Sequence, residues 1–381
     1  MKIQQTYRIY PNTEQQQVIN QWLGNARYIW NYMLNQNIEQ YKIDKTFNSE
    51  YGMNELIPNL KRELNWLKLS PSQTLQQKCQ DLRKALPNST NKAAKRGFPR
   101  FKAKHRDISG IRFPQGWHLN GNRLNLPKLK GIKINLHRII EGKAGYLTLK
   151  RDSVGSYFVS ILYDIPDVEP IEIKSSIGID VGLKEFAVTS DGELIKNPKF
   201  YRKSEKKLIK AQKNHSRKEK GSNNKEKSRI NLAKIHRDIR WKRQDFIKQI
   251  ASSIAKNYDL ITTESLNIKG MLKNHKLAKS ISDVGWSMFI NELKWQCTKR
   301  GKHFNQVDRW FASTKTCSSC GNKQDLTLSD REYKCDCGIQ IDRDLNAAIN
   351  INRAGTAQIN ACGMNIGYEF SPGNLTPLGV R

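Results

Sequence analysis

The chain has 381 residues, 37% of them hydrophobic, which is enough for two or three domains with cores and excludes a disordered chain. Its net charge of +31 at pH 7 far exceeds what solubility requires, so we expect a polyanionic partner, with nucleic acid as the first candidate. A merely basic or ribosome-associated surface is the alternative. The N-terminus lacks the apolar segment of a secretory signal and no window reaches the ~18 apolar residues of a membrane span, so we expect a cytoplasmic protein.

The N-terminal part of the chain predicts a strand followed by helices. The segment MKIQQTYRIYP reads as a short strand that its proline ends. Asn12 and Thr13 can then cap a helix, because apolar residues follow them at three- and four-residue steps. A further helix is expected over PSQTLQQKCQDLRKAL, and glycine and proline in the basic stretch NSTNKAAKRGFPRFKAK break the helical period.

The chain then changes to short alternating runs, of which IKINLH at 132–137 and YFVSILY at 157–163 are the clearest strands. A second region opens with SSIGIDV, an apolar strand carrying Asp180. Residues 199–243 contain 18 Lys or Arg against 4 acids, which marks either a solvated helix or a helix that faces nucleic acid. Because salt bridges cannot neutralise so one-signed a charge, we favour contact with phosphates.

Helix and strand patterns alternate again after this basic run. A helix containing FIKQIASSIAKN precedes the apolar strand YDLITTE, which ends on Glu264. The amphipathic helix WSMFINELKWQCTKRG follows, and HFNQVDRWF is a strand leading into a cluster of cysteines.

Four of the seven cysteines form two short-spaced pairs with 14 residues between them. An odd number of cysteines in a large chain without a secretory signal argues against a disulfide framework. Two such pairs are the ligand set of a zinc ribbon, and a glycine just after each pair suits a tight turn. Free cysteines are the alternative, because the second pair is one residue shorter than the usual spacing. The predicted zinc ligands are Cys317, Cys320, Cys335 and Cys337.

Three acids lie where an apolar strand ends or a helix begins: Asp180, Glu264 and Asp344. An acid at such a position is costly unless a cation or hydrogen bonds compensate it. Each has a simpler alternative, since Asp180 could make a turn, Glu264 could end its strand and Asp344 could cap the following helix. Together they match the oxygen ligands of two Mg²⁺ ions in a phosphodiester hydrolase.

Several motifs in a fixed order carry a resemblance that covers nearly the whole chain: YRIYPN with the helix after it, GFPRFK at 97–102, GIDVGLKEFAV at 178–188, TTESLNIKGM at 262–271, SSCG after STKTC, and DRDLNAAINI at 342–351. They resemble TnpB, the family of transposon-encoded RNA-guided DNA endonucleases that is also similar to compact type V CRISPR effectors. The resemblance implies a RuvC-like nuclease with an RNase H core, interrupted by a zinc ribbon before its last helix.

By position, the resemblance implies that Asp180, Glu264 and Asp344 are the catalytic acids and hold two Mg²⁺ ions, with one structural Zn²⁺ on the cysteines. Asp342 is the near rival of Asp344. The family's pattern favours the aspartate that precedes x-Asn, so Asp342 and Arg343 are expected to be supporting residues.

We therefore expect an α+β protein of two lobes, an N-terminal β-barrel-like wedge with an inserted helical recognition bundle and a C-terminal RuvC-like nuclease with an inserted zinc ribbon. The expected ranges are 1–10 and 101–172 for the wedge, 11–100 for the helical recognition domain, 173–312 and 341–356 for the nuclease, 313–340 for the ribbon, and 357–381 for a flexible tail.

The resemblance further implies a bacterial or archaeal, nucleoid-associated monomer that binds a guide RNA from the transposon end. It would cleave guide-matched double-stranded DNA beside a short target-adjacent motif. A nuclease-inactive RNA-guided repressor and a DNA transposase are the alternatives. The cations expected to contact nucleic acid are Lys95, Arg96, Arg100, Lys102, Lys104, Arg202, Lys206, Lys210, Arg217, Arg237 and Arg240.

Overall fold

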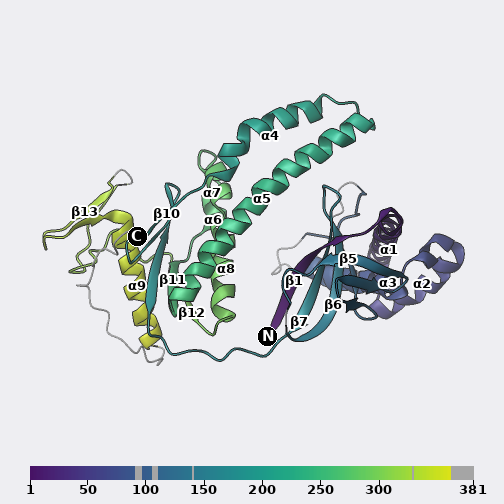
Figure 1. The fold of residues 1–381 in the computed structure, drawn as a ribbon, viewed down its shortest axis with the longest axis horizontal. Coiled ribbons are helices and arrows are strands. Elements are labelled where there is room, and N and C mark those ends of the chain that lie inside the picture. The colour runs from purple at the N-terminus through teal and green to yellow at the C-terminus, as the bar shows by residue number, and fades with distance from the viewer. Residues whose placement is uncertain (91–96, 105–109, 140, 328–329, 362–381) are drawn as a thin grey trace. The chain divides into compact units, whose positions relative to one another are not determined.

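The computed structural model describes residues 1–90, 97–104, 110–139, 141–327 and 330–361 (Figure 1). The chain divides into two compact units, Met1–Asp167 and Val168–Arg381. This division falls slightly before the lobe boundary at 172/173 that the sequence led us to expect. Among the described residues, no helix is both long enough and apolar enough to span a membrane.

The first unit is built on an antiparallel sheet of seven strands in the order β2-β6-β7-β1-β5-β4-β3. Its central strand β1 (Lys2–Tyr10) alternates between exposed and buried residues, and Tyr7 and Ile9 lie in the core. The strands expected at the N-terminus, at 132–137 and at 157–163 are confirmed as β1, β5 and β7. After β1, the strands of this sheet are β2 (Ile111–Phe113), β3 (His118–Asn120), β4 (Arg123–Leu126), β5 (Leu129–Asn135), β6 (Lys143–Arg151) and β7 (Tyr157–Asp164).

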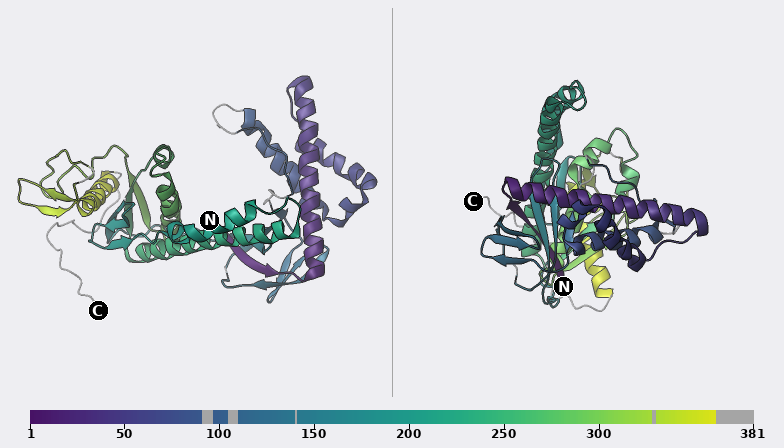
Figure 2. Two further views of the ribbon diagram at one scale, coloured as in Figure 1. Left: turned by 90° about the horizontal axis from the view of Figure 1, so that it is seen from above. Right: turned by 90° about the vertical axis from the view of Figure 1, so that its right-hand side faces the viewer.

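Helix α1 (Thr13–Asp44) joins this sheet to a helical cluster. Asn12 caps the helix as expected, through a capping box with Gln15. Trp22 is fully buried in the core of the sheet, and its indole N–H donates to the Leu69 carbonyl at 2.9 Å. The long span of α1 is clear from above (Figure 2). Its second half packs with α2 (Glu50–Glu63), the 3₁₀ turn η1 (Asn65–Leu69) and α3 (Ser72–Thr90).

The second unit contains a sheet of five strands in the order β10-β9-β8-β11-β12. Strands β8, β9 and β10 pair antiparallel, whereas β11 and β12 run parallel to β8. Ile177 and Ile179 of β8 pack into a core shared with α5 and α8, so the alternate residues of β8 face the other side of the sheet. The strands are β8 (Ser176–Val181), β9 (Glu185–Thr189), β10 (Leu194–Lys196), β11 (Leu260–Glu264) and β12 (His303–Val307).

The basic run at 199–243 forms most of a helical hairpin rather than one helix. Helices α4 (Phe200–Ser216) and α5 (Asn223–Asn257) lie side by side in both views (Figures 1 and 2). The chain turns at Gly221, whose φ is +91°, and Ser222 then caps α5. Short helices α6 (Ile268–Met271) and α7 (Ala278–Val284) lead to α8 (Trp286–Thr298).

The C-terminal part consists of the hairpin β13 (Glu332–Lys334) and β14 (Gln340–Asp342), followed by α9 (Arg343–Ala361). Helix α9 continues through Ala361, so the segment 357–361 is helical where we expected the tail to have begun. The remainder of the expected tail lies outside the described residues.

Candidate active site and four-cysteine centre

Helix α9 lies directly against one face of the five-stranded sheet, and two glycines allow this close approach. A Cβ atom at Gly178 of β8 would collide with the Ala348 carbonyl oxygen of α9. A Cβ atom at Gly355 of α9 would likewise collide with the Thr262 hydroxyl of β11. Because neither contact leaves room for a methyl group, the backbone of α9 packs directly on β8 and β11.

Asp180 and Glu264 lie next to each other at one edge of this sheet. Strands β8 and β11 are parallel neighbours with Ile179 opposite Thr263, so the next residue of each strand is one of the two acids. Asp180 comes two residues after Gly178, and side chains two apart share a face of a strand. Asp180 is therefore on the face that α9 covers.

Asp344 approaches the same place from α9. It lies in the first turn of the helix, one turn before Ala348. A helix rises about 6 Å over these four residues, and β8 rises about 6.6 Å from Gly178 to Asp180. Both acids are thus a similar distance from the contact between Gly178 and Ala348, and the charge of Asp344 acts on Asp180.

The other two acids perturb Asp180. Burial raises the pKa of Asp180 well above its usual value, and the negative charges of Glu264 and Asp344 raise it further. Burial also raises the pKa of Glu264. Among the described residues, only the four cysteines form a compact group of potential metal ligands, with all their ligand atoms within 4.8 Å of one another. The three carboxylates are therefore spread more widely than the four thiols. Clustered carboxylates of this kind are oxygen ligands for hard cations such as Mg²⁺.

Asp342 has a different role from Asp344. Its Oδ1 accepts hydrogen bonds from the backbone N–H groups of Asp344, at 2.9 Å, and Leu345, at 3.1 Å. This is how a residue caps the start of a helix. Arg343 contacts Asp344 Oδ1 at 3.4 Å. The carboxylate of Asp342 thus holds the first turn of α9, in which Asp344 lies.

Three residues that the sequence did not single out connect the acids to the cysteines. Ser313 is buried and donates a hydrogen bond to Glu264 Oε1. Asn346 and Asn350 are buried on α9, and both donate to the Thr316 carbonyl, at 2.8 and 2.6 Å. The two asparagines are four residues apart, on one face of a helix. That spacing in the sequence could have indicated a structural role for both residues, because asparagine is a poor helix former and a buried asparagine amide needs hydrogen-bond partners.

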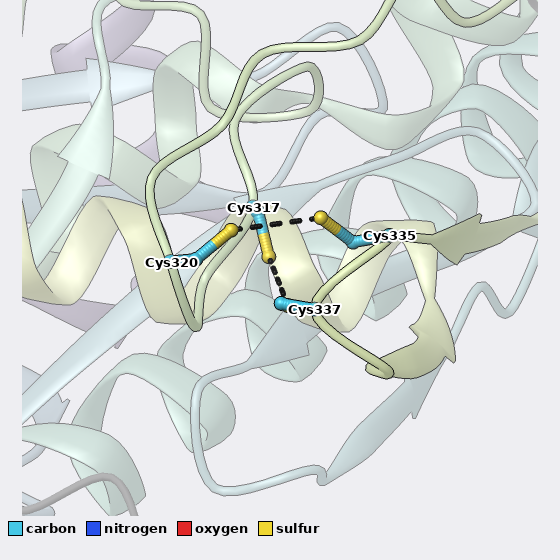
Figure 3. Close-up of side chains that lie close together, drawn as sticks. All are labelled: Cys317, Cys320, Cys335 and Cys337. Carbon is cyan, nitrogen blue, oxygen red and sulfur yellow. Dashed lines mark hydrogen bonds between the residues drawn. The ribbon is translucent and has the colours of Figure 1, made fainter.

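The four expected zinc ligands come together in one cluster (Figure 3). Their ligand atoms all lie within 4.8 Å of one another. The sulfurs of Cys317 and Cys337 are 3.7 Å apart and those of Cys320 and Cys335 are 3.5 Å apart. Both distances are far longer than the ~2.05 Å of a disulfide. Thiolates about 2.3 Å from one tetrahedral zinc would be about 3.8 Å apart, so the cluster fits that ion.

The turns around the cluster follow the sequence prediction. Gly321 and Gly338 have φ values of +81° and +87°, which favour glycine, and each follows its cysteine pair directly. The short second pair is accommodated in the turn of the β13–β14 hairpin. Tyr333 is buried beneath the cluster, and burial together with the nearby thiolate charges raises its pKa to about 12.

The cations expected to bind nucleic acid have different surroundings. Lys95 and Arg96 lie outside the described residues, whereas Arg100, Lys104 and Arg240 are exposed. Three more have contacts within the protein. Lys102 lies 3.7 Å from the ring centre of Trp30, and the Arg202 guanidinium donates to Ser280 at 3.0 Å. Arg237 lies over the ring of Trp241 at 4.5 Å.

The remaining cations share one face of α4. Lys206, Lys210 and Arg217 line a shallow surface pocket together with Ile209, Lys213 and Asn214. These positions recur at three- and four-residue steps, so they form a single stripe along the helix. We call Lys206, Lys210, Lys213 and Arg217 the α4 stripe. Its four cations are exposed, and they share one side of the helix with an exposed apolar side chain, Ile209.

The fold and the cysteine centre define a class, the mixed α+β proteins of the Cas12f-like type. The solved "Cryo-EM structure of the Cas12f1-sgRNA-target DNA complex" matches 90% of this chain and 83% of that chain, with a TM-score of 0.56 and 18% identity. This likeness concerns the fold alone. The family "Cas12f1-like, TNB domain" matches residues 286–351, which include all four cysteines.

The chain belongs to the TnpB-like IS605 OrfB family. A "Putative RNA-guided DNA endonuclease" of Streptomyces pristinaespiralis is 33% identical over 368 residues, covering 94% of this chain and 90% of that protein. The "Putative RNA-guided DNA endonuclease InsQ" of Escherichia coli (strain K12) is 29% identical over 379 residues, covering 94% and 93%. The family OrfB_IS605, described as "Probable transposase", matches residues 160–275. A "Helix-turn-helix domain" matches residues 1–46, which here form β1 and the single helix α1.

Proposed function

We propose that this chain is an RNA-guided DNA endonuclease in which Asp180, Glu264 and Asp344 hold two Mg²⁺ ions. The observation that carries the proposal is the arrangement of the acids, two at the ends of adjacent strands and the third in the first turn of the helix that crosses them. Several acids gathered at one partly buried edge are costly without cations. Two divalent cations held by these acids would compensate them.

Each acid has a distinct role in this proposal. When bound, the ions would activate a water molecule and stabilise the leaving oxygen of the phosphodiester. Asp180 lies on the face of β8 that α9 covers, where the charges of both other acids act on it, so it would be one of the ligands of the ions. Glu264 accepts a hydrogen bond from Ser313 at Oε1, which would favour metal binding through Oε2. Asp344 is presented by the capped first turn of α9.

The proposal assigns the second unit to a RuvC-like nuclease of the RNase H type. Its strand order β10-β9-β8-β11-β12, antiparallel on one side of β8 and parallel on the other, supports this assignment. The four cysteines would hold one structural Zn²⁺ in a ribbon inserted ahead of α9. In the first unit, the sheet of β1 to β7 would be the wedge, and the helices α1 to α3 the recognition domain.

The proposed partners are a guide RNA from the transposon end and a double-stranded target DNA. Base pairing between the guide RNA and one DNA strand would then supply most of the sequence specificity. The protein would read a short target-adjacent motif and bind the backbones of the RNA and the DNA. The net charge of +31 and the α4 stripe support phosphate contact. The two relatives described above, each named as an RNA-guided DNA endonuclease, support the choice of an RNA guide and a DNA target.

The test is cleavage by the protein purified together with its RNA. Asp180→Ala, Glu264→Ala and Asp344→Ala should each abolish cutting of guide-matched DNA in Mg²⁺ while target binding is kept, because pairing and backbone contacts do not need these acids. Loss of both cutting and binding would point to misfolding instead. A wild-type complex that binds but never cuts would favour the repressor, and joining of transposon ends would favour the transposase.

Asp342 supplies the matched control for this experiment. Asparagine caps helices about as well as aspartate, so Asp342→Asn should keep the cap on α9 and retain cutting. Asp344→Asn should abolish cutting, because a neutral amide is a poor ligand for Mg²⁺. The opposite result, with Asp342→Asn inactive and Asp344→Asn active, would show that the wrong aspartate was assigned to the metals.

A further inference from the structure

We infer that Ser313 is a positioning residue for Glu264 and that the four-cysteine centre holds Ser313 in place through Asn346 and Asn350. The inference rests on the proposed function of Glu264 as a metal ligand. It gives the cysteine centre a second task besides local folding. The centre would set the geometry of the acid site through a chain of buried hydrogen bonds.

The first link is the contact between the serine and the acid. Ser313 is 3% exposed, and its hydroxyl donates to Glu264 Oε1. Glu264 also accepts at its main-chain carbonyl from the Gln306 amide, at 3.3 Å. A hydrogen bond to one carboxylate oxygen fixes the rotation of the carboxylate and occupies one of its lone pairs, so it favours metal binding through the other oxygen. Hydrogen bonds of this kind orient metal ligands and are worth about 10- to 100-fold in metal affinity or activity.

The second link fixes the backbone of Ser313. Its carbonyl accepts from Asn350 Nδ2 at 2.8 Å, and the same amide donates to the Thr316 carbonyl at 2.6 Å. Asn346 donates to the Thr316 carbonyl at 2.8 Å and accepts from the Ser318 backbone N–H at 2.8 Å. Both amides come from α9, which also carries Asp344. The segment that carries Ser313 is therefore tied to the helix that carries another of the acids.

The third link joins this segment to the thiols. Cys317 stands between Thr316 and Ser318, the two residues that Asn346 holds. Its backbone N–H donates to the Asn322 carbonyl at 2.8 Å, and its sulfur lies 3.7 Å from that of Cys337. Fixing Cys317 in a four-thiolate centre thus also fixes the run from Ser313 to Ser318. The run also has a bridge between Thr316 and Lys323, and the Lys315 carbonyl accepts from the Gln324 N–H and the Tyr333 hydroxyl, so the centre and the asparagines add to these contacts.

The test is the metal requirement of the protein purified with its RNA. Ser313→Ala should raise the Mg²⁺ concentration for half-maximal cutting by about 10-fold or more, because Glu264 loses its orientation. Binding of Mn²⁺, followed by electron paramagnetic resonance with no DNA present, should weaken in parallel. Ser313→Thr keeps the hydroxyl and should restore both properties. Ser319→Ala is the matched control, since Ser319 is exposed in the same segment, and it should behave as wild type.

A double-mutant cycle tests the chain of contacts. Asn350→Leu keeps the approximate volume of the side chain but removes both of its hydrogen bonds, so it should shift the metal requirement in the same direction as Ser313→Ala. If the two residues act in series, the double variant should be little worse than either single variant. Additive effects would show that Ser313 and Asn350 do not act in series. Melting temperatures of all variants would show whether a weaker metal response comes from loss of folding.

The two proposals fail in different ways. If Ser313→Ala keeps the wild-type Mg²⁺ requirement and Mn²⁺ affinity while Glu264→Ala loses both, the positioning role of Ser313 is wrong and the metal role of Glu264 stands. If the wild-type complex neither cuts nor binds Mn²⁺, the proposed function itself is wrong.

Discussion

Gly178 of β8 lies so close to Ala348 of α9 that the helix carbonyl occupies the place of a side chain. This contact positions the two acids beyond it, Asp180 two residues along the strand and Asp344 one turn back along the helix. Sheet and helix therefore meet at a point where any side chain would push α9 outward. The distance between the acids depends on a residue that has no side chain.

The first prediction concerns this contact. Gly178→Ala should destabilise the protein by about 1–3 kcal/mol, because the new methyl group would collide with the backbone of α9 and push the helix away from β8. It should also lower cutting more than target binding, since Asp344 moves away from Asp180. Chemical unfolding and cleavage assays check these two effects. Gly24→Ala is the control, since its new methyl group would meet its nearest atom at 3.8 Å within α1 and should be neutral or stabilising.

The second prediction concerns the cysteine centre. The protein should carry about one zinc per chain, and Cys317→Ser or Cys320→Ser should lose it and lower the melting temperature, because metal binding contributes folding free energy. Elemental analysis of folded protein measures the metal. Cys297→Ala is the control, because Cys297 is buried in the core of the second unit and its loss should cost stability but leave the zinc in place. Folded wild-type protein that contains no zinc would contradict the assignment.

The third prediction concerns the α4 stripe. Replacing Lys206, Lys210, Lys213 and Arg217 with glutamine should weaken binding of RNA and DNA and flatten its dependence on salt. Each lost phosphate contact lowers the slope of log affinity against log salt by about 0.7–0.9, so four could lower it by about 3. Affinity measured at several salt concentrations tests this. Changing the three lysines to arginine keeps the charge and should keep the slope, and an unchanged slope in the glutamine variant would make the stripe ordinary solvated surface.

Local patterns were enough to predict many of the elements and the cysteine cluster. The β8 strand could be read because Ile177 and Ile179 alternate around Asp180, and four cysteines in two short pairs have few other uses. The pattern could not show that Ile179 lies opposite Thr263. That register joins strands far apart in the chain, and it is set by packing between the sheet and the helices on its two faces.

The sequence did not indicate the roles of some residues around the site, for a physical reason. Ser313 and Asn350 are polar residues whose importance depends on where a distant segment folds back, which no local periodicity encodes. The basic run was read as helical, but its break into two helices depends on the left-handed conformation of Gly221 and the cap at Ser222. The many charged residues of that stretch predict one long helix and give no indication of the turn. The catalytic role of the three acids stays a prediction.

The last prediction concerns pH and Asp259, which lies at the other end of β8 and β11 from the acids. Burial by itself would raise the pKa of Asp259, but the Lys174 backbone N–H at 3.1 Å, the Ser175 hydroxyl at 3.0 Å and the Lys302 ammonium at 3.3 Å together hold it below its usual value. An acid whose folded pKa is lowered stabilises the fold above its unfolded pKa, and this contribution is lost as the pH falls through the folded pKa.

Asp259→Asn should therefore cost about 1 kcal/mol at neutral pH, because hydrogen bonds to a charged group and an ion pair are lost. The difference from wild type should shrink as the pH falls through and below the ordinary range of aspartate, where Asp259 itself becomes neutral. Urea unfolding at a series of pH values measures this difference. Asp325→Asn is the control, because Asp325 pairs with Lys315 at 2.7 Å but its side chain is 96% exposed, so water screens the pair. A difference between Asp259→Asn and wild type that stays constant from neutral to acid pH would show that the charge of Asp259 contributes nothing to the fold.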